Sequence, residues 1–196
     1  MQIVIKETDR LNAILSDFLN YSQPKKNNNT IIDLTQLIQD VIILLKNKED
    51  INSKRPIVFK GTTDHLILNG DEEQIKQVVW NLCINALEAM SQGTLTLKLK
   101  EVFSFRSGEF QANHRGMVLE VQDEGCGIAL DQINNIYDPF YSSKKNGVGL
   151  GLATVYQIVN RNEGVMDVKS TVGKGTLFTV FLPDQDSLKS VPMLSH

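Results

Sequence analysis

Two glycine clusters on either side of a polar loop are the first feature of this sequence that could support chemistry. Gly125 and Gly127 follow an Asp-Glu pair, and Gly147, Gly149 and Gly151 lead into a predicted helix. Glycine lets a backbone approach a ligand closely, and a helix N-terminus offers free N–H groups to an anion such as a phosphate. The pattern predicts a nucleotide site. Two glycine turns in an ordinary α/β domain explain the residues equally well, because short glycine motifs often arise by chance.

The helix predicted over residues 71–90 carries a second set of polar side chains that could act on a ligand. Asn81 and Asn85 lie one turn apart, and Gln77 and Glu88 continue the same face. Asparagine is a mediocre helix former because its side chain competes for backbone hydrogen bonds, so two of them in a helix interior indicate a role for their amides. An amide oxygen is a hard, neutral ligand that suits Mg²⁺ beside phosphates. A solvated polar face is the alternative, and these residues alone favour it.

Composition limits the classes of protein to consider. The chain has 196 residues, 41% of them apolar, which predicts one domain with an appendage. A net charge of −3 without a basic tract argues against a dedicated nucleic-acid or membrane-surface binder. No signal-peptide pattern and no apolar run long enough to span a bilayer is visible. Cys83, Cys126, His65 and His114 lack metal-ligand spacing, so we expect no metal site there and a reducing, cytosolic compartment.

The elements that must position these residues follow from periodicity and capping patterns. Residues 1–23 are predicted to form a helix with an apolar stripe, which either packs on the main domain or pairs with a helix missing from this chain. Pro24 ends it and residues 24–30 form a polar linker. Asp33 caps the next helix, with Gln36 reaching back to the cap.

The rest of the chain alternates between strands and helices. The helix at residues 71–90 has an apolar face for packing on a sheet, and Trp80 is expected in the core rather than on a base. Gly164 is expected to close the helix that follows the second glycine cluster. Strands are predicted at residues 57–60, 66–68, 94–102, 117–121, 166–170 and 177–182, with a loop at 104–115, a short helix at 130–136 and a polar tail over 184–196.

Five motifs in a fixed order carry a family resemblance. The second glycine cluster lacks the preceding strand of a dinucleotide fingerprint, and the turn at residues 173–176 lacks P-loop spacing. In chain order, the motifs are Asn81-Leu-Cys-Ile-Asn85-Ala, Asp123-Glu-Gly125-Cys-Gly127, Pro139-Phe140-Tyr-Ser-Ser-Lys144, Gly147-Val-Gly149-Leu150-Gly151-Leu-Ala153 and Gly173-Lys-Gly175-Thr176. Residues 30–183 thereby resemble the ATP-binding domain of bacterial sensor histidine kinases. That domain is of the wider family shared with type II topoisomerases, heat-shock chaperones and mismatch-repair ATPases.

The resemblance implies a fold and a domain division. The expected fold is an α/β domain, an α+β two-layer sandwich with a Bergerat-type mixed sheet covered on one face by helices, and a single N-terminal helix. Residues 1–23 resemble the second helix of a dimerisation and histidine-phosphotransfer hairpin, and residues 31–183 resemble the ATP-binding catalytic domain. The motifs at residues 85–90 and 139–144 look most like the nitrogen-sensor subgroup.

The resemblance also implies roles for individual residues. Asp123 would accept a hydrogen bond from the adenine amino group, which favours ATP over GTP because guanine has a carbonyl there. Asn85 would bind Mg²⁺ with support from Asn81, and Lys144 would hold the phosphates with the backbone of Gly147, Gly149, Leu150 and Gly151. Phe140 would anchor a mobile lid over residues 141–146. Gly125, Gly127 and Thr176 complete the expected nucleotide-binding set.

The implied activity is transfer of the γ-phosphoryl group of Mg-ATP to a histidine in two-component signalling. Hydrolysing relatives carry a glutamate base where this chain has Asn81, and an amide cannot take the proton from water. An ATP hydrolase of the same fold, or a non-catalytic nucleotide-sensing scaffold, are the alternatives. The expected partners are the histidine-bearing dimerisation helix and a response-regulator receiver domain. The parent protein would be a homodimer, membrane-attached or not, that binds no nucleic acid.

Two departures from the family pattern shape these expectations. His65, His114 and His196 lack the acidic residue and proline that follow a phosphoacceptor histidine. We therefore expect a fragment that starts within the second hairpin helix, binds ATP and does not label itself. Glu88 and Ala89 stand where many relatives have a basic residue and an aromatic one, which implies different packing around the phosphates and the adenine.

Overall fold

The computed structural model describes residues 28–47, 54–61, 65–107, 110–112, 115–142, 144 and 147–184. The predicted helix at residues 1–23 and the tail after Asp184 lie outside these ranges. Within them, no helix is both long enough and apolar enough to cross a membrane.

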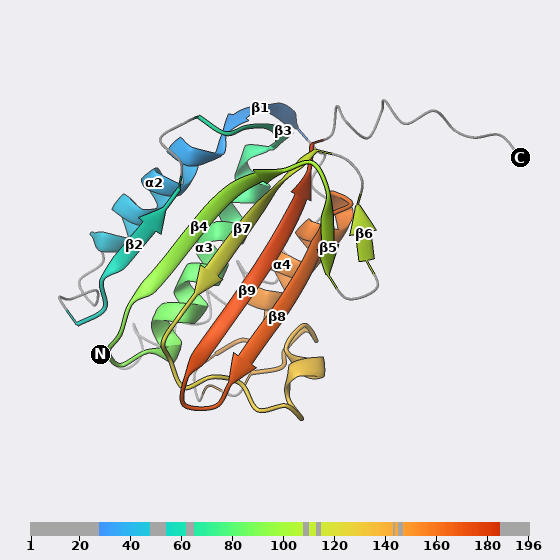
Figure 1. Cartoon of the computed structure of the whole chain (residues 1–196). Coiled ribbons are helices and arrows are strands. Elements are labelled where there is room, and N and C mark those ends of the chain that lie inside the picture. The colour runs from blue at the N-terminus through green and yellow to red at the C-terminus, as the bar shows by residue number, and fades with distance from the viewer. Residues whose placement is uncertain are drawn as a thin grey trace, which may run out of the picture.

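A five-stranded mixed sheet with helices on one face forms the domain, and this confirms the predicted fold class. In Figure 1 the sheet faces the viewer and the helices lie behind it. One pair of neighbouring strands in this sheet, Ile57–Lys60 with Leu95–Val102, is parallel, and the other three neighbouring pairs are antiparallel. Across the sheet the order is β2 (Ile57–Lys60), β4 (Leu95–Val102), β7 (Gly116–Gln122), β9 (Gly175–Pro183) and β8 (Val165–Thr171); the helices are α2 (Leu34–Lys46), α3 (Glu72–Ala89) and α4 (Gly151–Arg161).

Alternation along the central strands separates the core from the open face of the sheet. In β4, Leu95, Leu97 and Leu99 are buried in the main core cluster that the helices cover. Lys98 and Lys100 alternate with these leucines and lie on the other face, where both pair with Glu120 of the neighbouring strand β7. The sheet therefore buries one face and solvates most of the other.

Both predicted aspartate caps are present. Asp33 begins α2 by accepting a hydrogen bond from the Gln36 backbone N–H at 3.1 Å, and Asp71 begins α3 by accepting from the Gln74 N–H at 3.0 Å. These side chains satisfy N–H groups that have no partner within the helix. The reciprocal half of the predicted capping box is wrong, because the Gln36 side chain donates to Asp40 one turn further along instead of reaching back.

The helix after the second glycine cluster ends differently from the prediction. Glu163, not Gly164, has the left-handed backbone, with φ of 56°. The Glu163 N–H donates to Asn160 O and the Gly164 N–H donates to Val159 O, which is the Schellman pattern. A Cβ on Gly164 would lie 2.4 Å from the backbone oxygen of Phe181. Glycine is therefore needed at this position for close packing on β9 rather than for its φ angle.

Two short strand pairings were not predicted from the sequence. The linker was predicted to extend to residue 30, but a strand already begins at residue 29: β1 (Asn29–Asp33) pairs with β3 (Ile67–Asp71). The predicted loop at residues 104–115 contains a hairpin of β5 (Phe105–Ser107) and β6 (Phe110–Ala112). The ring of Phe105 stacks on Phe181 at 4.9 Å, so burial of an aromatic pair stabilises this hairpin on the open face.

Two smaller predictions also fail. The helix predicted at residues 130–136 is reduced to one turn of 3₁₀ helix, η1 (Ile133–Asn135). Asp184, predicted to begin the tail, is buried and forms an ion pair with Arg115 at 3.4 Å. The Asp184 ion pair depends on a residue that is distant in sequence.

We predict that Gly164→Ala lowers the free energy of unfolding by about 1–3 kcal/mol, because the added methyl group must displace a strand backbone. Urea unfolding of the whole chain measures the change.

Glu163→Gly is the matched control at the neighbouring position. It should be neutral or raise stability by up to about 1 kcal/mol, because glycine adopts the left-handed backbone without the usual penalty. A Gly164→Ala chain as stable as the wild type would contradict the packing account.

Candidate functional site

The sequence motifs meet at one end of the sheet. The C-terminal half of α3, the segment between β7 and α4, and the turn between β8 and β9 come together there, at the lower end of the molecule in Figure 1. The Ala89 carbonyl at the end of α3 accepts from the Cys126 N–H at 3.1 Å, and the Gly173 N–H donates to Cys126 O at 2.8 Å. The first glycine cluster is thus fixed between a helix end and a hairpin turn.

Asp123 lies in the interior of this site. Its side chain is 3% exposed, and its Oδ1 accepts from the Gly125 N–H at 2.8 Å and from the Thr176 N–H at 3.2 Å. Burial raises the pKa of this carboxyl above its ordinary value, although the two N–H groups oppose the shift. Within the part of the chain that the structure describes, Oδ2 makes no hydrogen bond. The carboxylate therefore has one oxygen available to a ligand donor.

The glycines of the first cluster are required by backbone contacts. Gly127 has φ of +71°, and a Cβ there would lie 2.2 Å from the Thr171 oxygen. A Cβ on Gly125 would lie 2.6 Å from Ala89 O, and one on Gly175 would lie 2.0 Å from Asp123 O. The loop can hold the Asp123 carboxylate only because three backbone segments approach it this closely.

Ser170, at the end of β8, is a residue of this site that the sequence did not reveal. Its hydroxyl accepts from the Ile128 N–H at 2.8 Å, lies 3.1 Å from Gly175 O and contacts the Thr176 hydroxyl at 2.9 Å. It therefore ties the first glycine cluster to the β8–β9 turn. A serine in a strand has no distinguishing pattern, so only its partners identify this role.

The second glycine cluster places the N-terminus of α4 against the asparagines of α3. The Asn81 amide donates to Gly151 O at 3.3 Å, and a Cβ on Gly151 would lie 3.5 Å from Asn85 Nδ2. Leu150 precedes the helix without a side-chain cap, so the N–H groups of the first turn have no partner within α4. Among the described residues these N–H groups have no acceptor, and they lie beside two amide side chains.

The segment before this cluster is anchored by Tyr141 rather than by its phenylalanine. The Phe140 ring is 61% exposed and its backbone has φ of +67°, whereas Tyr141 packs against the main core. The Phe140 N–H donates to Gly149 O at 3.0 Å, and Gly149, at φ of +75°, lies against the Tyr141 backbone. The Phe140 side chain therefore remains exposed to a ligand or partner.

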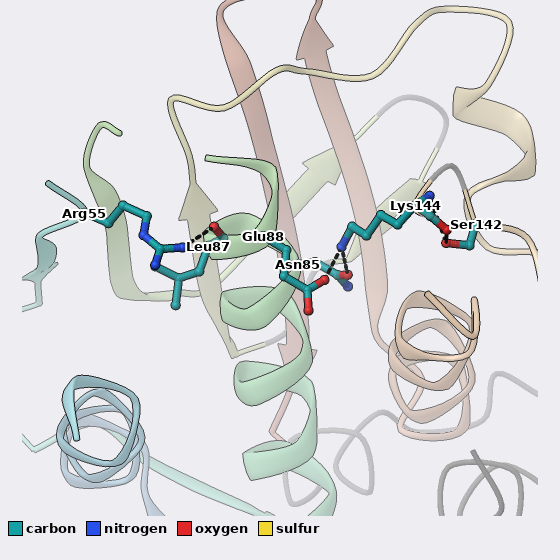
Figure 2. A network of polar contacts seen from close by, with 6 residues as sticks. All are labelled: Arg55, Asn85, Leu87, Glu88, Ser142 and Lys144. Carbon is teal, nitrogen blue, oxygen red and sulfur yellow. Dashed lines mark hydrogen bonds and ion pairs between the residues drawn. The ribbon is translucent and has the colours of Figure 1, made fainter. Parts of the chain in front are cut away.

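Lys144 crosses from this segment to α3. Its ammonium group donates to Asn85 Oδ1 at 3.0 Å and forms an ion pair with Glu88 (Figure 2). The sequence predicted that Asn85 and Lys144 serve the same ligand, and the structure brings them into contact. It did not predict the Glu88 pair, because the two charges are 56 positions apart in the sequence and no local pattern links them.

The C-terminal end of α3 is stabilised by an arginine from another part of the chain. No basic residue lies in the last turn of α3, and Arg55 supplies the charge by donating to Leu87 O at 3.1 Å (Figure 2). A cation at a helix C-terminus interacts favourably with the helix dipole.

The donor set fits a magnesium ion held jointly with a substrate, not a closed protein metal site. In the described ranges no cluster of three or more His, Cys, Asp or Glu side chains could hold a metal. Cys83 is buried, which raises the pKa of its thiol to about 12. Cys126 is exposed, and both cysteines are free thiols. Mg²⁺ commonly binds one or two protein oxygens together with phosphates and water, and the Asn85 amide oxygen suits that role.

Comparison with known proteins decides the family. Residues 70–186 match the family described as "Histidine kinase-, DNA gyrase B-, and HSP90-like ATPase", which is more than half of the chain. This chain belongs to that family. The resemblance to the ATP-binding domains of sensor histidine kinases is therefore confirmed, whereas the nitrogen-sensor subgroup and the roles of single residues stay predictions.

The chain is also similar to a named sensor histidine kinase. The chain is 34% identical over 185 residues to "Sensor histidine kinase ZraS" of Salmonella typhi, and the match covers 93% of this chain and 37% of ZraS. The chain therefore spans little more than a third of that relative.

Solved histidine kinases share the fold. Full-length ShkA in complex with AMPPNP superposes with a TM-score of 0.75 at 21% identity, over 91% of this chain and 36% of ShkA. ThkA in complex with the response regulator protein TrrA superposes with a TM-score of 0.73 at 23% identity, over 93% of this chain and 50% of that chain.

The raised pKa of Asp123 predicts a pH-dependent gain in stability for Asp123→Asn. Between the ordinary value of 3.8 and the raised value, the folded state binds the proton more tightly than the unfolded state. The contribution of Asp123 to stability therefore falls as pH rises through that interval and stays lost at neutral pH. Asparagine keeps an acceptor oxygen and removes the buried charge, so the variant should be more stable than the wild type at about pH 7.

Urea unfolding at about pH 7 and at about pH 4 measures this difference. The gain should shrink toward the lower pH, where the wild-type carboxyl is increasingly protonated. A variant that is less stable than the wild type at neutral pH would contradict the inference.

Proposed function

We propose that this chain binds Mg-ATP and transfers the γ-phosphoryl group to a histidine on the dimerisation helix of a sensor kinase. The observation that carries the proposal is the buried Asp123 carboxylate, with one oxygen held by two backbone N–H groups and the other available. A buried, unpaired acceptor is costly unless a ligand donor satisfies it.

The adenine amino group has the right chemistry for that oxygen. It would donate to Asp123 Oδ2, while Gly125 and Thr176 keep the carboxylate fixed through Oδ1. Guanine presents a carbonyl oxygen at the corresponding position, which would leave the carboxylate facing another acceptor. Sites built on such polar pairing discriminate strongly between analogues.

The phosphates would bind between α3 and the N-terminus of α4. The free N–H groups of the first turn of α4, with the backbone of the second glycine cluster, favour an anion there. Lys144 would turn from its partners on α3 toward the phosphates, and Asn85 would offer its amide oxygen to the metal. A bound Mg²⁺ would supply charge neutralisation, so the protein's own contribution is mainly positioning.

Asn81 favours transfer over hydrolysis. Its amide donates to the Gly151 carbonyl, which fixes the start of α4 against α3. A neutral amide in this position cannot accept the proton of an attacking water. An imidazole nucleophile brings its own lone pair and does not need such a base, which is consistent with a histidine acceptor.

The relatives support the partners that we propose. ZraS is named a sensor histidine kinase, and ThkA has been solved with a response regulator. We propose that residues 31–183 act as the catalytic domain, that residues 1–23 form one helix of the dimerisation hairpin, and that a receiver domain takes the phosphoryl group from the histidine.

Calorimetric titration with a non-hydrolysable ATP analogue and Mg²⁺ tests the site. The wild type should bind the ATP analogue and discriminate against the GTP analogue. Asp123→Asn should weaken ATP binding by at least about tenfold, because a hydrogen bond to a charged acceptor is lost. Since we expect this variant to be the more stable one, lost binding cannot be attributed to unfolding.

Glu124→Gln is the matched control. Glu124 is the next residue, is exposed, and accepts from the Thr94 N–H on the outside of the loop. This change should alter affinity less than about twofold. Equal affinity of the wild type for the two nucleotides would refute the adenine role.

Transfer can be measured with γ-labelled ATP and a separately expressed histidine-bearing hairpin whose second helix has the sequence of residues 1–23. Label should appear on the hairpin in acid-labile form, while this chain alone stays unlabelled. Phosphate release without the hairpin should be much slower than transfer. Rapid release with no labelled hairpin would instead establish a hydrolase.

A further inference from the structure

Glu88 has no part in the function proposed above, although it lies on the same face of α3 as Asn85 and less than one turn away. Its carboxylate pairs with the Lys144 ammonium, which also donates to Asn85 Oδ1 (Figure 2). Two oxygens of α3 therefore hold one cation, and one of these oxygens is the atom that we assign to Mg²⁺.

We propose that Glu88 is a specificity-determining residue that makes the site select nucleotide carrying Mg²⁺ over metal-free nucleotide. The inference rests on the proposed function, because it requires phosphates to bind beside Asn85. It concerns a residue to which the sequence assigned no binding role, and its contact with Lys144 places it at the site.

Without a metal, Glu88 opposes phosphate binding. The carboxylate cancels the charge of Lys144, so the pair presents no net positive charge to the phosphates. If Lys144 moves to the phosphates, an unpaired carboxylate remains next to them on α3. Repulsion between like charges is screened here, because the Glu88 and Lys144 side chains are 52% and 38% exposed. Screening keeps the effect to several-fold in affinity rather than abolishing binding.

With a metal on the nucleotide, the same carboxylate is tolerated. Asn85 Oδ1 cannot remain the acceptor for Lys144 beside a divalent cation, because the two positive charges would meet at one oxygen. Lys144 is then released toward the phosphates, and Glu88 faces a metal that attracts it instead of an anion that repels it. Glu88 therefore penalises only the metal-free ligand.

The test compares two dissociation constants of the whole chain for a non-hydrolysable ATP analogue, one with Mg²⁺ and one with EDTA. Glu88→Gln keeps the shape and polarity of the side chain and removes its charge. We expect it to tighten metal-free binding by about fivefold and to change Mg²⁺-loaded binding by less than about twofold. Glu88→Lys changes the charge by two units and should reduce the dependence on Mg²⁺ further.

Glu72→Gln is the matched control, since it removes the same charge from the exposed first turn of the same helix. Sixteen residues of helix place it about 24 Å from Glu88, so the ratio of the two constants should not change. Thermal unfolding of each variant provides a second readout, and the midpoint for Glu88→Gln should match the wild type because the side chain is half exposed.

The possible results separate the two proposals. A wild type that binds the analogue while Glu88→Gln leaves the ratio of constants unchanged would overturn this inference alone. An equal shift of both constants would also overturn it, because it would show a general electrostatic or structural role. A wild type that binds under neither condition would overturn the proposed function and this inference with it.

Discussion

The burial of the apolar face of α3 is the constraint on which the rest of the site depends. Ile75, Val78, Val79, Leu82 and Ala86 are each at most 4% exposed, so the rotation of the helix about its axis is fixed by the core. That rotation directs the polar face, with Asn81, Asn85 and Glu88, toward the start of α4 and the segment that carries Lys144. A helix free to rotate could not keep these amides at one ligand.

A second constraint is the cost of holding a carboxylate in the interior. Asp123 is buried, and loss of water raises the pKa of its carboxyl although hydrogen bonds from two backbone N–H groups oppose the shift. The surrounding glycines, the Ser170 hydroxyl and the Ala89 carbonyl hold the loop in place despite the cost of burying this carboxyl. Such a cost is expected where a polar group serves a ligand rather than the fold, which is consistent with the role that we propose for Asp123.

Much of the architecture was predictable because it depends on local chemistry. The caps at Asp33 and Asp71, the apolar face of α3 and most of the sheet strands follow from side-chain type and spacing, and the structure has them. Several of the predictions that failed depend on distant partners. β1 requires β3, β5 packs on Phe181, and the close approach of Phe181 O explains Gly164. No local pattern reports such contacts.

The sequence by itself determined the family and the residues that could form a nucleotide site, because five motifs in one order leave few alternatives. Only the tertiary structure decided how these residues are coupled. It placed Lys144 on Asn85 and Glu88, which lie 59 and 56 positions away in the sequence. It also gave the anchoring role to Tyr141 while leaving Phe140 exposed, and it joined two loops through Ser170. Hydrogen bonds and ion pairs between separate elements depend on distances in the folded chain, and spacing along the sequence does not encode those distances.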